Sequence, residues 1–132
     1  MSLAVRVRFA ETDQMRVAHH SAYIVWLEAA RIEWLRERGL SYRTLEDEGV
    51  SLAVSAISVM YHQSSRFDDM LRVEATMTEL RSRRVRFRYV IRRGETKMAS
   101  GDSLHTPVDS AGRVTRLPRM WLESLHEHLE TP

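Results

Sequence analysis

The chain has 132 residues, of which 43% are hydrophobic and 29% charged, a composition that fits one folded domain over residues 1–132 rather than a disordered segment. Its formal net charge is only +2, which is weak support for a general nucleic-acid-binding field. The absence of cysteine excludes disulfides, a cysteine nucleophile and a thiolate metal site. The N-terminus lacks the apolar core of a signal peptide, and no apolar stretch approaches the length of roughly 18 residues that a membrane helix needs. We therefore expect a cytoplasmic protein without membrane insertion.

The first elements predicted along the chain are a strand and a helix. Residues 3–9 alternate between apolar and polar side chains, which is the period of a half-buried strand. A loop containing Asp13 follows. Residues 21–38 carry apolar side chains at helical spacing, with Trp26, Ala29 and Ala30 widening the apolar surface, so we expect a core helix that ends at Gly39. A short helix over 41–48, ended by Gly49, comes next.

Strands are predicted over residues 50–63, 70–81, 83–93 and 97–108, with turns at 67–69, 93–95 and 109–112. This order suggests an antiparallel meander. A final helix begins near Pro118 and carries an apolar stripe of Trp121, Leu122, Leu125 and Leu129. Together with the first strand, these elements predict an α+β fold in which an antiparallel sheet curls around a central helix.

Asp13 and His20 are the candidate catalytic residues. Asp13 is either a turn or cap residue, or a general base toward water or a nucleophile toward a carbonyl. His20 lies seven positions later, beside His19 and at the start of the predicted helix. Its ring has the chemistry to orient a carboxylate or carbonyl, and backbone N–H groups in the first helical turn polarise a carbonyl oxygen. The alternative for His20 is a surface or helix-capping role.

Glu28 and a group of arginines are further candidates. Glu28 lies on an apolar stretch of the helix, where it either assists catalysis or, as we favour, pairs with Arg31 or Arg66. Alternation within residues 84–89 places cations on one strand face and apolar side chains on the other. The resulting basic stripe either grips phosphates or forms a solvated sheet face or a subunit contact, and it comprises Arg81, Arg83, Arg84, Arg86 and Arg88.

Several kinds of site are excluded by the pattern. His126 and His128 are two apart on a predicted helix and point to different sides, so we expect no metal site. The zinc-protease, P-loop, dinucleotide-glycine and Gly-x-Ser-x-Gly motifs are absent from the sequence, and we expect no cofactor. The arginines lack an interleaved exposed aromatic platform, so we expect no nucleic-acid partner.

Three blocks of sequence together resemble a known family. The first comprises Phe9, Glu11-Thr12-Asp13, His20, Tyr23 and Glu28-Ala29-Ala30-Arg31; the second spans residues 61–71, and the third spans 99–118. In this order, over nearly the whole chain, they resemble the 4-hydroxybenzoyl-CoA thioesterase-like branch of the hotdog-fold acyl-CoA thioesterases. Two departures involve glycine: Asp68 replaces the family's usual Gly, and Gln14-Met15-Arg16 replaces the Ala-Gly-Gly loop of one subgroup. We therefore expect a different loop shape and substrate fit.

The resemblance implies a hotdog fold, with an antiparallel sheet wrapped around a long central helix, and hydrolysis of acyl-CoA to a free acid and CoA. It implies that Asp13 is the catalytic carboxylate, that a backbone N–H near His20 polarises the thioester carbonyl, and that the His20 ring assists orientation. The family places its site between subunits, so a homodimer or homotetramer is expected. The candidate substrate-binding residues are Tyr23, Glu28, Arg66, Arg81, Arg83 and Arg84, the arginines being candidates for the CoA phosphates.

Two other functions are compatible with the same fold. A noncatalytic acyl-CoA-binding or regulatory module would bind the ligand in the same pocket, although the presence of Asp13 argues against it. A dehydratase acting on a hydroxyacyl thioester would need a His and an acid placed on the central helix in a way that this chain does not show.

Overall fold

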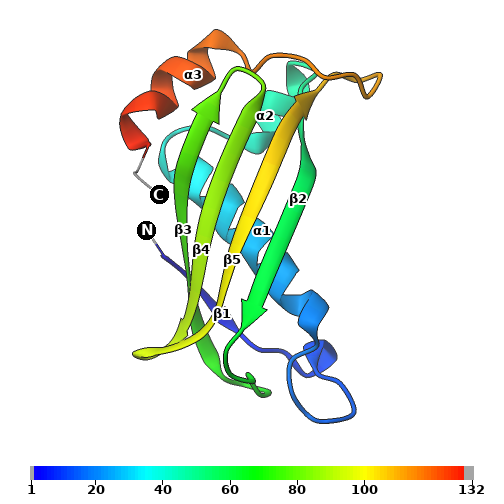
Figure 1. Cartoon of the computed structure of the whole chain (residues 1–132), viewed down its shortest axis with the longest axis vertical. Helices are drawn as coiled ribbons and strands as arrows, with labels where there is room; N and C mark the ends of the chain where they lie inside the picture. The colour runs from blue at the N-terminus through cyan, green and yellow to red at the C-terminus, as the bar shows by residue number, and fades with distance from the viewer. Residues whose placement is uncertain (1, 130–132) are drawn as a thin grey trace.

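The computed structural model describes residues 2–129 and contains one antiparallel sheet with helices packed against it (Figure 1). The strands lie in the order β1-β3-β4-β5-β2. They are β1 (Ser2–Arg6), β2 (Ser51–Tyr61), β3 (Met70–Arg81), β4 (Arg84–Arg93) and β5 (Thr96–Val108). The helices are α1 (His20–Glu37), α2 (Tyr42–Asp47) and α3 (Arg119–Leu125), with 3-10 turns η1 (Phe9–Glu11) and η2 (His126–His128).

The predicted meander is correct for β3, β4 and β5 but wrong for β2. Strands β3, β4 and β5 pair consecutively, whereas β2 pairs with β5 at the far edge of the sheet. Residues 62–69 therefore cross the end of the sheet and bring β3 beside β1. Alternating hydrophobicity predicts that a strand exists, but it does not specify which strand lies next to it.

The first strand is shorter than its alternation predicts. Pairing with β3 ends at Arg6, and Val7 instead exchanges backbone hydrogen bonds of 2.9 Å with the segment at Asp68 and Asp69. The chain then turns into η1, where the Phe9 ring is 76% exposed instead of continuing the buried face. The turn carries the chain away from the sheet and into the loop that contains Asp13.

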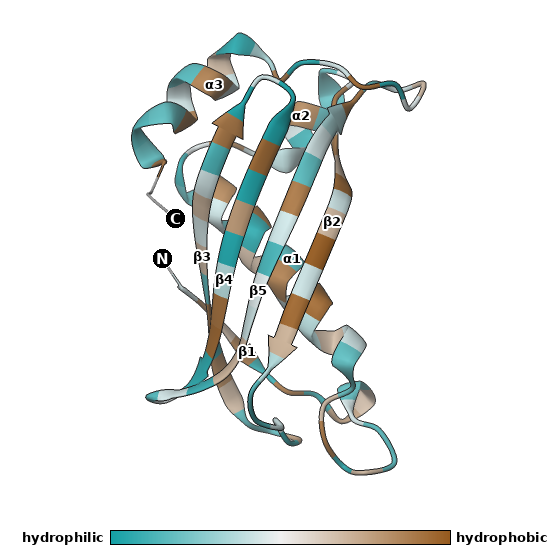
Figure 2. Cartoon of the chain, viewed as in Figure 1, coloured by the Kyte–Doolittle hydropathy of each residue, from teal (hydrophilic) through white to brown (hydrophobic). Residues whose placement is uncertain are grey.

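Helix α1 lies across one face of the sheet (Figure 1). The apolar face of β4 packs into the core, and Figure 2 shows hydrophobic residues alternating with hydrophilic ones along this strand. On the opposite side of α1, Ile24, Val25, Glu28 and Ala29 are exposed, so the prediction that Ala29 belongs to the core is wrong for the single chain. No helix within residues 2–129 has the length and apolar character needed to cross a membrane.

Gly101 in β5 permits the close approach of α1. A β-carbon added there would lie 2.9 Å from Cδ1 of Leu27 and 3.2 Å from the carbonyl oxygen of Ser58. Leu27 is only 1% exposed, so its side chain is held in the core. The residue type at position 101 therefore sets how closely the helix and the sheet pack.

A chain of polar groups lies buried between α1 and the sheet. Arg31 donates a 3.5 Å hydrogen bond to the Tyr89 hydroxyl, which lies 2.7 Å from the Ser103 hydroxyl. Ser103 in turn lies 2.7 Å from Nε2 of His105. Burial, followed by the nearby positive charge of Arg31, lowers the pKa of His105 from 6.5 to about 3. His105 is therefore neutral in the folded protein at ordinary pH.

Candidate active site

Asp13 occupies a loop that closes on itself between η1 and α1. Its backbone N–H donates to the Val17 carbonyl at 2.9 Å, and its Oδ1 accepts hydrogen bonds from the backbone N–H groups of Met15 at 2.8 Å and Val17 at 3.4 Å. Asp13 is thus a turn residue, as one of its two predicted roles required. The same hydrogen bonds fix the position of its carboxylate, which is also what a catalytic acid or base needs.

Glu11 anchors this loop to helix α1. Its carboxylate accepts hydrogen bonds from the Arg8 backbone N–H at 2.8 Å and from the Trp26 indole at 2.9 Å. Burial acts to raise the pKa of Glu11, but these hydrogen bonds and the Arg8 charge outweigh it, so the pKa is lowered from 4.5. The sequence alone identifies Glu11 only as part of a motif, because its partner Trp26 is distant along the chain.

The start of α1 lies beside Asp13. His19 is the N-cap, and its Nδ1 accepts the Ser21 backbone N–H at 3.1 Å, so the capping role predicted as an alternative for His20 belongs to its neighbour. The His20 carbonyl accepts a 2.9 Å hydrogen bond from the Tyr61 hydroxyl. Within residues 2–129, the His20 backbone N–H has no hydrogen-bond acceptor. It is therefore available to a ligand.

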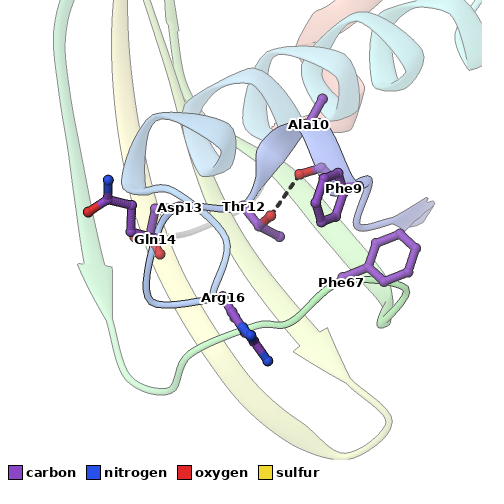
Figure 3. Close-up of a pocket in the computed structure, with 7 residues that line it drawn as sticks. All are labelled: Phe9, Ala10, Thr12, Asp13, Gln14, Arg16 and Phe67. Atoms are coloured by element: carbon purple, nitrogen blue, oxygen red, sulfur yellow. Dashed lines mark hydrogen bonds between the residues drawn. The ribbon is translucent and has the colours of Figure 1, made fainter.

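Asp13 borders two hollows in the surface. The larger, here called the apolar hollow, has a volume of about 850 Å³ and is lined by Phe9, Ala10, Thr12, Asp13, Gln14, Arg16 and Phe67 (Figure 3). The smaller, here called the polar hollow, has a volume of about 290 Å³ and is lined by Asp13, Ala18, His20, Tyr23, Tyr61, His62, Gln63 and Ser64. A ligand that spans both hollows would pass Asp13.

Tyr23 and Tyr61 form one wall of the polar hollow. Tyr23 is 2% exposed, its hydroxyl accepts the Ser65 backbone N–H at 3.3 Å, and its ring packs edge-on against Tyr61 at 4.9 Å between centroids. Burial, together with the neighbouring Tyr23, raises the pKa of Tyr61 above 10.0, which keeps its hydroxyl protonated as a donor. Tyr23 is one of the predicted substrate-binding residues. Tyr61 has no predicted role, because its partner is a backbone carbonyl, which residue type and spacing do not indicate.

Glu28 does not form the ion pair expected for it. It lies on the exposed face of α1 and, among the described residues, forms no ion pair. The expected pairing with Arg31 or Arg66 is therefore wrong, since Arg31 turns inward to Tyr89. Glu28 also does not line either hollow in the single chain.

The predicted phosphate-binding arginines fall into two groups. Arg66 lies close to the Asp13 loop, because its backbone bridges to Val17. Arg81, Arg83 and Arg84 lie at the β3–β4 hairpin, at the opposite end of the sheet from that loop (Figure 1). Arg16 lines the apolar hollow instead, although the sequence indicates it only as part of an unusual loop.

Comparisons with known proteins show the family to which the chain belongs and the structures that share its fold. Residues 7–125 match the model of the Thioesterase-like superfamily. The acyl-CoA thioester hydrolase YbgC of Escherichia coli O6:H1 is 36% identical over 77 residues, which are 58% of this chain and 58% of that protein. The crystal structure of TT1821 from Thermus thermophilus superposes with a TM-score of 0.92 at 35% identity, covering 96% of this chain and 98% of that one. DHNA-CoA thioesterase from Staphylococcus aureus shares the fold, with a TM-score of 0.92 at 24% identity, over 96% of this chain and 88% of that one.

Proposed function

The chain belongs to the thioesterase-like superfamily and is a thioester hydrolase, and from this premise we propose that it hydrolyses acyl-CoA to a free acid and CoA at Asp13. The observation that carries the proposal is the position of the Asp13 carboxylate, which is fixed by the backbone and borders both hollows. The reactive carbonyl of a substrate that spans the two hollows would lie at this carboxylate.

The reaction needs a nucleophile and a site for the negative charge that develops on the carbonyl oxygen. Asp13 either accepts a proton from a water molecule as that water attacks the thioester carbon, or attacks the carbon itself and is regenerated by water. The backbone N–H of His20 donates to the carbonyl oxygen as it becomes negative. When the tetrahedral intermediate collapses, the C–S bond breaks and CoA leaves as a thiolate. Little acid assistance is needed, because a thiolate is a good leaving group.

The two hollows suggest the direction in which the substrate lies. The residues that line the apolar hollow include Phe9, Ala10 and Phe67, which suit an acyl group. The polar hollow presents histidine, tyrosine, glutamine and serine side chains, which suit the amide-containing arm of CoA. The acyl group therefore extends toward Phe9 and Phe67, and CoA extends past Tyr61.

The proposal includes a second subunit. A copy packed on the exposed side of α1 would enclose this helix and make it the long central helix of a hotdog dimer, from which a homotetramer can form. Arg66 is the candidate for binding CoA within the same subunit, and its backbone bridge to Val17 beside the Asp13 loop supports that role. Arg81, Arg83 and Arg84 would reach CoA only from a neighbouring subunit, because they lie at the other end of the sheet.

Replacing Asp13→Asn tests the proposal, because asparagine preserves an oxygen that can accept the turn hydrogen bonds but lacks basicity. We expect turnover to fall by roughly 10²–10⁴-fold with KM largely retained. The measurement is release of free thiol from a panel of acyl-CoA esters with aliphatic and aromatic acyl groups.

A matched control is Asp109→Asn. Asp109 accepts backbone N–H bonds from Ala111 at 2.9 Å and Arg113 at 3.0 Å in a turn remote from the site, so this variant should retain wild-type turnover. Unchanged turnover in Asp13→Asn would reject the catalytic role. Acyl-CoA binding by the wild-type protein without thiol release from any ester would instead favour the noncatalytic binding module.

A further inference from the structure

Residues 13–17 and residues 109–113 form the same loop. In each, the carboxylate of the first residue accepts the N–H groups of the third and fifth residues, at 2.8 and 3.4 Å from Asp13 and at 2.9 and 3.0 Å from Asp109. The first N–H donates to the fifth carbonyl, at 2.9 and 2.8 Å respectively. The fourth N–H donates to the first carbonyl, at 3.0 and 2.9 Å.

The fourth residue of each loop adopts the left-handed conformation, but the two residue types differ. Gly112 has φ 80°, and Arg16 has φ 65°. Glycine adopts this conformation without steric strain, whereas a residue with a β-carbon is strained by it. The loop at residues 109–113 thus shows that glycine fits this backbone conformation at the fourth position. A strained residue beside a candidate catalytic group points to a role for its side chain.

The surroundings of Arg16 indicate what that role is. Arg16 lines the apolar hollow together with Phe9 and Phe67, whose rings are 76% and 55% exposed and meet edge to face at 5.9 Å (Figure 3). Among residues 2–129, Arg16 forms no ion pair. The nearest acid in the sequence, Asp13, directs Oδ1 to backbone N–H groups. The hollow therefore combines apolar walls with an unpaired guanidinium.

Building on the proposed function, we propose that Arg16 is a specificity residue that binds a free carboxylate carried by the acyl group. The apolar walls contact the hydrocarbon part of such an acyl group, and a guanidinium binds a carboxylate with two parallel hydrogen bonds. The substrate class is then the CoA monothioesters of dicarboxylic acids, with the thioester carbonyl at Asp13 and the free carboxylate at Arg16.

The test compares wild type with Arg16→Gly, a substitution that the loop at Gly112 shows to be compatible with the backbone. The substrates are matched pairs of increasing length: succinyl-CoA and butyryl-CoA, glutaryl-CoA and valeryl-CoA, adipyl-CoA and hexanoyl-CoA. We expect wild type to prefer the carboxylate-bearing member of at least one pair.

In Arg16→Gly, kcat/KM for that member should fall by about 10–100-fold, while kcat/KM for the neutral member changes by less than about threefold. The melting temperature should rise by roughly 2–4 °C as the strain is relieved.

Two further variants serve as controls. Arg16→Lys retains the charge without the bidentate fork and should recover part of the preference. Arg43→Gln removes the same charge from an exposed arginine on α2 and should leave both members of each pair unchanged. Wild type without a preference in any pair would overturn the inference. So would an equal loss for both members in Arg16→Gly, since that result would assign Arg16 to CoA or to the positioning of Asp13.

Affinity measurements distinguish failure of this inference from failure of the proposed hydrolysis. Calorimetry with the Asp13→Asn protein, with and without Arg16→Gly, measures affinity for each member of a pair without turnover. A carboxylate-dependent loss of affinity on removing Arg16 would support the inference even if the wild-type protein released no thiol from any ester. That second result would reject only the proposed hydrolysis. Equal affinities in the two proteins would reject the role of Arg16 whatever the activity.

Discussion

At the scale of single residues, chemical type and spacing predict which side chains are candidates for the site. They do not predict which partners each side chain contacts. Asp13 has the hydrogen bonds of an ordinary turn aspartate and also lies between two hollows, so its two predicted roles are compatible. The departures from the family pattern at Asp68 and Arg16 coincide with positive φ angles of 71° and 65°. The sequence thus indicated which loops are unusual. It did not indicate that Phe9 and Phe67 beside them are exposed, which depends on the fold.

His105 makes the stability of the fold depend on pH. The folded-state pKa is about 3 and the ordinary value is 6.5, so between these values the unfolded chain binds a proton that the folded chain does not. Stability therefore falls as pH decreases from about 6.5 toward 3, with a slope of up to roughly 1.4 kcal/mol per pH unit from this residue. Chemical denaturation between pH 5 and 7 measures the slope, and we expect His105→Gln to reduce it.

The comparison concerns the slope and not the absolute stability, so a general destabilisation by the substitution does not affect the conclusion. The lowered pKa of Glu11 has a separate effect. Its stabilising contribution is present above the ordinary value of 4.5 and is lost as pH falls below it, outside the measured range. Parallel stability curves for wild type and His105→Gln between pH 5 and 7 would contradict the assignment.

At the scale of elements, the hydrophobic periods predicted the long helix and strands β2, β3, β4 and β5 closely. The predicted strand over residues 70–81 coincides with β3, and the predicted helix over 21–38 differs from α1 by one residue at each end. The place of β2 at the sheet edge could not be predicted, because strand order depends on long-range pairing. The C-terminal stripe also ends early: α3 stops at Leu125, and Leu129 is 38% exposed beyond η2.

The packing of α1 on β5 predicts an effect of substitution at Gly101. In Gly101→Ala the new methyl group meets Leu27 at 2.9 Å and the Ser58 carbonyl at 3.2 Å, so the helix or the β2 backbone must move. We expect a loss of roughly 1–3 kcal/mol in the free energy of unfolding, the usual range for overpacking a core. Urea denaturation monitored by tryptophan fluorescence measures it.

The same experiment needs a companion variant, because the new methyl group would meet two groups, Leu27 and the Ser58 carbonyl. Leu27→Ala removes the side chain that the new methyl group would meet, so the double variant should lose less stability than the sum of the two single variants. Additive losses would show that Leu27 is not the group that resists a larger residue at position 101.

At the scale of the whole molecule, apolar side chains remain exposed on adjoining elements. Strand β2 is an edge strand, and its exposed residues include Val54, Ile57 and Met60, while α1 exposes Val25. An edge strand with free backbone groups and apolar side chains is a template for pairing with another strand. A second copy joined along β2 would satisfy this edge and cover the outer side of α1, which agrees with the homodimer proposed above.

Val54→Lys tests that assembly. Val54 is 53% exposed in the single chain, so a lysine there has little effect on the core, but at a β2–β2 contact it would place a charge at an apolar interface close to its own copy. We expect the dimer dissociation constant, measured by sedimentation equilibrium, to rise at least about tenfold. Thiol release should fall in parallel if the site includes the second subunit, as proposed. Val114→Lys changes a 59% exposed valine outside the sheet edge and should leave both quantities unchanged. A wild-type protein that sediments as a stable monomer and still releases thiol would show that one chain forms a complete site, and the exposed side of α1 would then need a different explanation.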